Sequence, residues 1–261
     1  MVIEPLNGVF FCFLLAFVAL AFLFVQVFKK KSEKSKTRFL VILYLLTLLL
    51  FVVYKTALPL DEEYIHICDE NWGGFSYWNE LPLNPCNIML LLMPVAARTR
   101  RKILLVMCFF TSFIGPTMAL LMPISGFSGV SLFLPRALGY YVTHVLILIA
   151  PILLFGLKIY RPCFRDVIFY IAGIILIAFV VFLINILLRK SGLCPAANYF
   201  FCMDPDNNAI LMFFFRLIPI PFLYVLPCSL LMVPACLLLT ALCKLGEILR
   251  DKIACQKETV I

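Results

Sequence analysis

Two residues in apolar stretches of the sequence carry side chains that can do chemistry, Cys86 and His144. His144 interrupts residues 138–150, which are otherwise apolar enough to lie in a lipid bilayer. An ionisable side chain is costly at membrane depth, so its presence indicates a function. A cysteine thiolate is a strong nucleophile, and a neighbouring imidazole can accept its proton. The two residues therefore predict a nucleophile and a base inside a membrane.

The composition indicates what positions these residues. Of 261 residues, 64% are hydrophobic and 14% are charged, which predicts one polytopic membrane domain over 1–261. The net charge of +8 comes from Lys and Arg in short links between apolar runs. That pattern is typical of membrane orientation, not of nucleic-acid binding. We expect a multi-pass protein of the plasma membrane or bacterial cytoplasmic membrane, whose first apolar run is not a cleaved signal peptide.

Seven segments approach the roughly 20 apolar residues that a membrane span needs. They are residues 8–28, 39–60, 81–97, 103–123, 136–157, 167–188 and 218–242. The links 29–38, 98–102 and 158–165 are basic, whereas 61–80 carries six acidic residues and no Lys or Arg. The positive-inside rule then predicts an all-α fold of seven transmembrane helices, with the N-terminus outside and the C-terminus in the cytoplasm.

The last apolar region is interrupted by prolines, so we expect two pieces there. Residues 209–217 are predicted to form an interfacial or re-entrant piece, followed by a proline-bent final helix. The mixed-charge tail after it is predicted to be partly helical.

Topology also predicts the depth of the polar residues. At 1.5 Å per residue, Cys86 lies roughly 8 Å and His144 roughly 12 Å below the outer boundary. Five more polar residues fall in the same slab: Asn84, Asn87, Arg136, Thr143 and Asn185. A site at this depth suits lipid ester groups. We expect Asn185 or Arg136 to bind a developing oxyanion or a phosphate.

Structural roles for the same residues remain open. A cysteine in an apolar run often packs as a small hydrophobe. A buried histidine can cap a carbonyl, bind a metal or relay protons, and intramembrane asparagines often bridge helices. Cys194 and Cys202 share one external loop and can pair, but the sequence does not require it. With two histidines in the chain, we expect no metal site and no cofactor.

Several short motifs resemble those of a known family. Leu81–Cys86 (LPLNPC) resembles the LPLxLC signature of the YwaF-type integral membrane family, which includes animal transmembrane protein 164. Five further matches follow in order: Thr143–His144, Tyr160–Pro162 (YRP), Ile184–Leu188 around Asn185, Asn198–Tyr199 (NY) and Pro219–Pro221 (PIP for the family's PWP). The resemblance runs from about Leu81 to Leu242. The sequence departs from the family at Pro85, where Leu is usual, and at Asn84, where His is frequent.

The resemblance implies a seven-helix acyltransferase fold with a cysteine acyl-enzyme and a histidine, which correspond to Cys86 and His144. We therefore predict a membrane lipid acyltransferase or transacylase of the outward-facing leaflet. Its donor would be a phospholipid or other acyl lipid, and its acceptor a lysolipid, a glycolipid or a lipoprotein amine. The expected substrate-binding or orienting residues are Asn185, Arg136, Asn84, Asn87, Asn198 and Tyr199.

Two alternatives use the same residues differently. An intramembrane acyl-ester hydrolase would pass the acyl group from the same pair to water. A non-enzymatic seven-helix receptor or transporter would use the polar slab as a ligand site, although a transporter should carry polar residues through both halves of the membrane.

Overall fold

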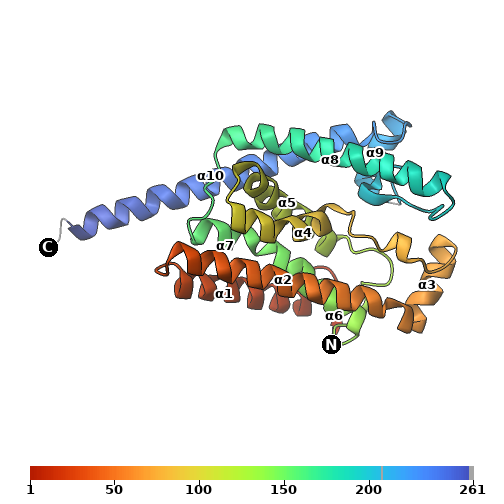
Figure 1. Cartoon of the computed structure of the whole chain (residues 1–261), viewed down its shortest axis with the longest axis horizontal. Coiled ribbons are helices and arrows are strands. Elements are labelled where there is room, and N and C mark those ends of the chain that lie inside the picture. Colours follow the sequence, from red (N-terminus) through yellow and green to blue (C-terminus); the bar gives the residue numbers. More distant parts are fainter. Residues whose placement is uncertain (207, 259–261) are drawn as a thin grey trace.

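The computed structural model describes residues 1–206 and 208–258 and is almost entirely helical (Figure 1). The helices are α1 (Gly8–Phe28), α2 (Glu33–Ala57), α3 (Glu62–Trp72), α4 (Pro85–Thr99), α5 (Lys102–Leu121), α6 (Pro135–Leu148), α7 (Ala150–Gly156), α8 (Phe164–Lys190), α9 (Ala209–Leu217) and α10 (Val225–Glu258). Three short 3-10 turns, η1 (Leu58–Leu60), η2 (Tyr77–Asn79) and η3 (Tyr199–Phe201), lie in the connections. The strand β1 (Val2–Ile3) pairs with β2 (Val130–Ser131) in antiparallel register.

Six helices in the described residues are long and apolar enough to cross a membrane: α1, α2 with η1, α5, α6 with α7, α8 and α10. The protein is therefore a multi-pass integral membrane protein. The remaining predicted segment corresponds to α4, an apolar helix of 15 residues. At 1.5 Å per residue α4 is about 22 Å long, which is less than the roughly 30 Å of a bilayer core.

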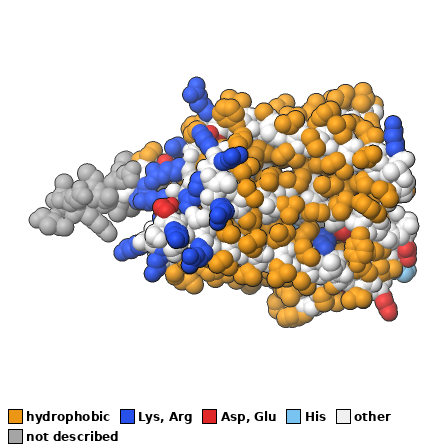
Figure 2. Space-filling view, in the orientation of Figure 1, with side chains coloured by type: hydrophobic (Ala, Val, Ile, Leu, Met, Phe, Trp, Pro, Cys, Tyr) orange, Lys and Arg blue, Asp and Glu red, His pale blue; other side chains and the backbone are white. Residues whose placement is uncertain are grey.

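The surface agrees with this assignment. Hydrophobic side chains cover the flank of the bundle, and Lys and Arg gather around the end from which α10 projects (Figure 2). Acidic side chains lie at the opposite end, near α3 (Figures 1 and 2). Apolar side chains on the outer faces of the long helices, such as Leu15 on α1 and Leu176 on α8, are more than 60% exposed. Lipid tails would cover these faces.

Prolines determine where several helices begin. Pro85 and Pro135 occupy the first positions of α4 and α6, where a missing N–H group has no cost. The third predicted segment therefore begins as a helix at Pro85, and residues 81–84 form the turn before it. Pro151 lies at the start of α7 and lacks the N–H group that would continue α6. One predicted segment, 136–157, is thus two consecutive helices.

The final span differs from the predicted 218–242. The interfacial piece is the helix α9, but α10 begins only at Val225, because Pro219 and Pro221 end α9 and the backbone turns at Phe222, where φ is 65°. The helix then continues to Glu258, through the tail that was predicted to be partly helical. Its 34 residues make it about 51 Å long, longer than a bilayer core is thick.

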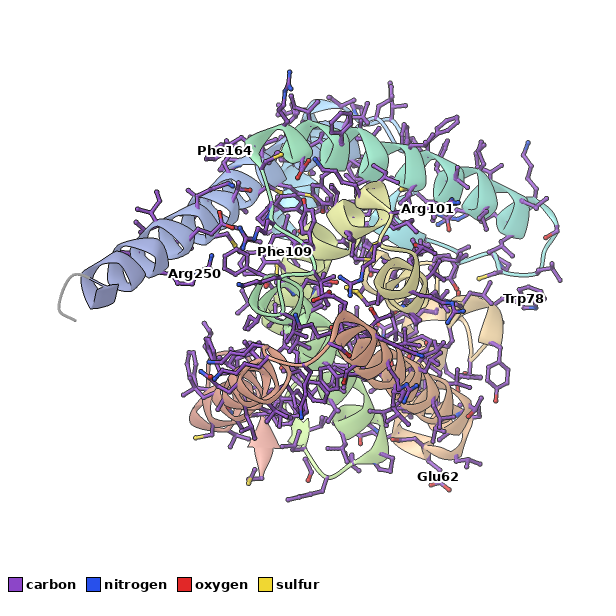
Figure 3. The ribbon with its side chains drawn as sticks, turned by 60° about the vertical axis from the view of Figure 1, so that its left-hand side comes forward. Glu62, Trp78, Arg101, Phe109, Phe164 and Arg250 are labelled. Carbon is purple, nitrogen blue, oxygen red and sulfur yellow. The ribbon has the colours of Figure 1, made fainter. Side chains whose placement is uncertain are left out.

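The central helix of the bundle is α5, which packs against α4, α6, α7 and α8. On one side, α2 packs against α4 and α6, and Gly139 of α6 lets them cross closely, since a Cβ atom there would lie 2.3 Å from Cβ of Tyr54. On the other side, α8 packs against α10. Side chains of several helices meet around Phe109 of α5, whereas Trp78 and Glu62 project at the end of the molecule (Figure 3). This arrangement leaves a cavity between α4, α5, α6, α8 and α10.

Candidate active site

A cavity of about 510 Å³ lies inside the bundle, and both Cys86 and His144 line it. Its walls are mostly apolar side chains of α5, α8 and α10, with α9 and the residues after η3 closing one end. No Lys, Arg, Asp or Glu of the described residues lines it. The sequence placed Cys86 and His144 at similar depth, and the structure places them around one apolar space.

Cys86 is the second residue of α4, directly after Pro85, and is 6% exposed. It therefore lies in the first turn of the helix. The first backbone N–H groups of a helix have no partner within it, and the positive end of the helix dipole lies there. Gly115 of α5 faces the thiol: a Cβ atom at that position would lie 2.8 Å from Sγ of Cys86 and 3.8 Å from its backbone nitrogen. Only glycine leaves the space that the thiol occupies.

His144 is fixed in one orientation by Tyr140, one turn earlier on α6. Its Nδ1 atom lies 2.8 Å from the carbonyl oxygen of Tyr140, and the two ring centroids are 4.2 Å apart. A carbonyl oxygen only accepts hydrogen bonds, so Nδ1 carries the hydrogen and Nε2 is left as the basic nitrogen. The hydroxyl of Tyr140 donates to the carbonyl of Ala119 at 2.7 Å and so anchors the tyrosine to α5.

No hydrogen bond joins Cys86 and His144 in the described part of the chain. Among the described residues, neither Sγ of Cys86 nor Nε2 of His144 forms a hydrogen bond with another side chain. Both atoms belong to residues that face the same cavity. In enzymes without substrate, catalytic hydrogen bonds are often long and shorten only when the substrate is bound.

The two asparagines of the α4 turn have different surroundings. Asn84 is the residue before α4, and its Oδ1 accepts a 3.3 Å hydrogen bond from the backbone N–H of Phe200. Asn87 is 8% exposed and lines the cavity one residue after Cys86. The side-chain amide of Asn87 has no hydrogen-bond partner within the described part of the chain. It is a buried polar group that faces empty space.

Asn185 is fully buried on α8 but lines no cavity among the described residues. Its Nδ2 donates to the carbonyl of Tyr199 at 2.9 Å, and its Oδ1 accepts from the N–H of Tyr199 at 3.0 Å. The Tyr199 hydroxyl in turn accepts from the N–H of Leu81 and donates to the carbonyl of Trp78. Asn185 therefore holds η3 in place, and η3 holds the turn that leads into α4.

Arg136 also lies away from the large cavity. Its side chain is 1% exposed, pairs with Asp61 and with Glu63 at 2.7 Å, and donates to the carbonyl of Gly126 at 3.0 Å. These contacts join the start of α6 to α3 and to the loop before β2. No arginine or lysine of the described residues faces either cavity, so the structure offers no cationic site for a lipid phosphate there.

A second, smaller cavity of about 120 Å³ adjoins the large one and shares Asn84, Ile124 and Phe201 with it. Its lining is more polar and includes Glu80, Asn79, Asn198, Tyr199 and Asp206. Asn198 binds the Asp204 side chain and the backbone of Met203 and Asp204. Burial and the nearby Asp204 carboxylate raise the pKa of Asp206 above its usual range. Of the sequence-predicted residues, Asn84, Asn198 and Tyr199 thus line this smaller cavity.

The two cysteines of the loop between α8 and α9 are not joined. Both are free thiols: Cys194 donates to Oδ1 of Asn79 at 2.7 Å, and Cys202 lies 3.7 Å from the carbonyl oxygen of Ala178. Burial raises the pKa of the Cys202 thiol to about 12. Within residues 1–206 and 208–258, no three His, Cys, Asp or Glu side chains are grouped as a metal site requires.

Comparison with known families agrees with the motifs. The sequence model of the TMEM164 family matches residues 6–240, which is nearly the whole chain. The chain belongs to the TMEM164 family. Searches of curated proteins and of solved structures returned no match.

For this TMEM164-family member, sequence reasoning missed several residues around the site. Gly115, Tyr140 and Tyr170 approach or line the cavity, as does a second thiol, Cys228 of α10. A glycine inside the apolar helix α5 was the one visible signal, because glycine in a helix interior usually marks a close contact. The apolar spans gave no indication of which tyrosine or cysteine faces inward.

Proposed function

We propose that this protein is a membrane lipid acyltransferase in which Cys86 carries the acyl group and His144 moves the protons. The observation that carries the proposal is the shared cavity: a thiol at a helix N-terminus and the basic Nε2 atom of a histidine face one apolar space inside the membrane domain. An ester carbonyl in that space can reach both groups.

The first half-reaction transfers the acyl group to the enzyme. Nε2 of His144 takes the thiol proton as Sγ of Cys86 attacks the ester carbonyl of the donor lipid. The tetrahedral intermediate collapses with cleavage of its carbon–oxygen bond, and the departing alkoxide takes the proton from His144. The products are a thioester on Cys86 and a lysolipid.

The second half-reaction returns the acyl group to a lipid. A hydroxyl or amine of the acceptor attacks the thioester carbonyl while Nε2 of His144 removes its proton. The carbon–sulfur bond then breaks, and the thiolate of Cys86 takes the proton back from His144. If water is the acceptor, the same steps release a fatty acid, which is the hydrolase alternative.

We assign the binding site of the oxyanion, which forms in both tetrahedral intermediates, to the first turn of α4. The donors would be the backbone N–H of Cys86, in the first turn of α4, and the side-chain amide of Asn87, which lines the same cavity, and the helix dipole favours negative charge there. Asn185 was the sequence-based candidate for this role, but both ends of its amide bind Tyr199. The smaller cavity beside Asn84 is lined by Glu80 and Asp206 and by no Lys or Arg of the described residues, so it would hold a neutral or cationic polar group of a lipid and not its phosphate.

The orientation is also part of the proposal. With α4 counted as a short seventh span, the basic links fall at the end from which α10 projects (Figure 2), as the positive-inside rule requires of the cytoplasmic side. The N-terminus and the first turn of α4 then lie toward the outer leaflet, and the donor and acceptor lipids come from that leaflet.

Intact-mass analysis after incubation with phospholipid tests the acyl-enzyme directly. We expect a hydroxylamine-sensitive acyl adduct on the wild-type protein and none on Cys86→Ala. Cys228→Ala is the matched control, because Cys228 is a second thiol that lines the same cavity, and it should keep the adduct. His144→Gln should slow adduct formation by about 10²- to 10⁴-fold. An adduct that persists in Cys86→Ala contradicts the proposal.

Product analysis separates transfer from hydrolysis. With a lysolipid present, a transferase gives a new diacyl lipid and little free fatty acid. A fatty acid yield that does not change with added lysolipid would support the hydrolase.

A further inference from the structure

The large cavity has two unlike ends. At one end Asn84, Ile124 and Phe201 line both this cavity and the smaller polar cavity. Sγ of Cys202, the residue after η3, lies 3.7 Å from the carbonyl oxygen of Ala178, so Ala178 of α8 is also at this end. From this end, the cavity is lined by α8 from Ala178 toward its N-terminus as far as Tyr170, and by α10 from Val225 toward its C-terminus as far as Ala235. The α10 stretch from Val225 to Ala235 rises about 15 Å, so Tyr170 and Ala235 lie at the far end.

The far end is closed by a contact between α8 and α10. The hydroxyl of Tyr170 donates to Sδ of Met232 at 3.9 Å, and both residues line the cavity. Tyr170 is 1% exposed, and its ring packs against that of Phe110 with a centroid separation of 5.3 Å. Cys236, one turn after Met232, is fully buried. Side chains from three helices thus close the space below Tyr170.

The walls between the two ends suit a hydrocarbon chain. Ile114, Ile174, Leu226 and Leu231 line them, and charged side chains of the described residues do not. The hydroxyl of Ser229 donates a 2.6 Å hydrogen bond to the carbonyl of Leu226 and so is not free to bind a ligand. A chain that moves from the lipid tails into this space exchanges one apolar environment for another, so its fit to the walls, and not transfer out of water, determines how well it binds.

We infer that Tyr170 and Met232 form the floor that limits the length of the acyl chain this protein accepts. The inference rests on the proposed function only in taking the bound hydrocarbon chain to be the acyl chain of the substrate. A chain attached at Cys86 runs from α4 toward α8 and α10 and ends against the Tyr170–Met232 contact. Methylene groups beyond that point have no room, so they weaken binding.

Binding of free fatty acids to Cys86→Ala protein tests the floor without requiring any catalysis. Saturated fatty acids from octanoate to docosanoate would displace a fluorescent fatty acid from the protein in nanodiscs. Affinity, expressed per mole fraction of fatty acid in the nanodisc lipid, should change little with chain length until the floor is reached and should then fall, because longer chains do not fit. Met232→Trp fills the far end and should move that limit to shorter chains, and Met232→Ala should move it to longer ones.

Leu230→Trp is the matched control, since Leu230 is on the same helix, is 61% exposed and does not line the cavity. It should leave the limit unchanged. Ala235→Leu gives a second test at the far end and should also shorten the limit. A limit that stays constant in both Met232→Trp and Ala235→Leu overturns the inference, as does an equal shift in Leu230→Trp.

The outcomes also distinguish failure of the floor inference from failure of the proposed acyl-enzyme mechanism. A limit that moves as expected, together with a wild-type protein that never forms the thioester, keeps the floor and rejects the proposed function. A thioester that forms equally with every chain length, in wild type and in Met232→Trp, rejects the floor and keeps the function.

Discussion

Two groups of buried polar residues lie in the same half of this protein, and their bonding differs. Arg136 and Asn185 form the first group: their side chains bind carboxylates or backbone groups of neighbouring segments. Asn87 and His144 form the second group: the Asn87 amide and Nε2 of His144 face the cavity without a partner in residues 1–206 and 208–258.

The difference shows that depth alone does not identify a membrane site. Buried polar groups are normally satisfied, and a satisfied group has no free donor or acceptor for a substrate. The first group fixes where α6 and η3 lie, and the second group offers hydrogen-bonding capacity to whatever enters the cavity. Substitutions should therefore affect stability in the first group and reaction rate in the second.

The largest expected effect is that of Asn87→Leu on acylation. Loss of a side-chain oxyanion donor lowers the rate by about 10²- to 10³-fold. Thermal stability should stay equal or rise, because an unpartnered amide leaves the interior. Single-turnover acylation and thermal unfolding measure the two quantities. The matched variant Asn185→Leu should do the reverse. It should lower stability by about 2 kcal/mol, because the backbone N–H of Tyr199 loses its acceptor and the Tyr199 carbonyl keeps only the longer hydrogen bond from the N–H of Cys202. Equal acylation rates in Asn87→Leu and wild type would remove Asn87 from the oxyanion site.

Next in size is the effect of Arg136→Met on stability. Removal of one partner of a buried ion pair costs about 3 kcal/mol, at the low end of the usual range because Glu63 is 62% exposed. Denaturant unfolding in detergent measures the loss, and acylation per folded molecule should not change. Arg100→Met breaks a surface pair, in which Glu33 is 66% exposed, and should cost less than about 1 kcal/mol. A specific loss of acylation in Arg136→Met would place Arg136 in the second group.

Gly115→Ala should lower the acylation rate about 100-fold, because the new Cβ atom displaces Sγ of Cys86 and small displacements of a reacting atom have effects of that size. Gly156→Ala creates a comparable clash, 2.6 Å from Cγ2 of Val25, but away from the cavity. It should therefore destabilise the fold without slowing acylation of the folded protein. Equal rates in both variants would show that the thiol tolerates displacement.

The smallest effect concerns the thiols of the loop between α8 and α9. Alkylation of the denatured protein without reductant should label both Cys194 and Cys202. In the native protein, Cys163, which lies in the link before α8 and is partly exposed, should react before Cys202, whose thiol is fully buried and has a pKa near 12. Peptide mapping measures both. A peptide pair joined by a disulfide would contradict the structure of this loop.

Hydropathy predicted the helical membrane fold, because spans need only length and apolar composition, and the short motifs from Leu81 onward predicted the family. The start of α10 was missed: Ile218 to Tyr224 is apolar, but Pro219 and Pro221 prevent the helix there. The sequence predicted a similar depth for Cys86 and His144, but depth alone could not show that the two residues line one cavity. The role of Asn185 could not be predicted. Its amide binds the backbone of Tyr199 in a connecting segment, and hydrophobic periodicity carries no information about such contacts.

The floor at Tyr170 and Met232 has a kinetic consequence. Donor and acceptor lipids would share one cavity of about 510 Å³ above that floor, so the lysolipid left by the donor must depart before the acceptor can take its place. Initial rates measured against both lipids should then give parallel double-reciprocal lines, as a substituted-enzyme mechanism requires. High acceptor concentrations should inhibit the reaction by occupying the unacylated enzyme, and the donor should relieve that inhibition competitively.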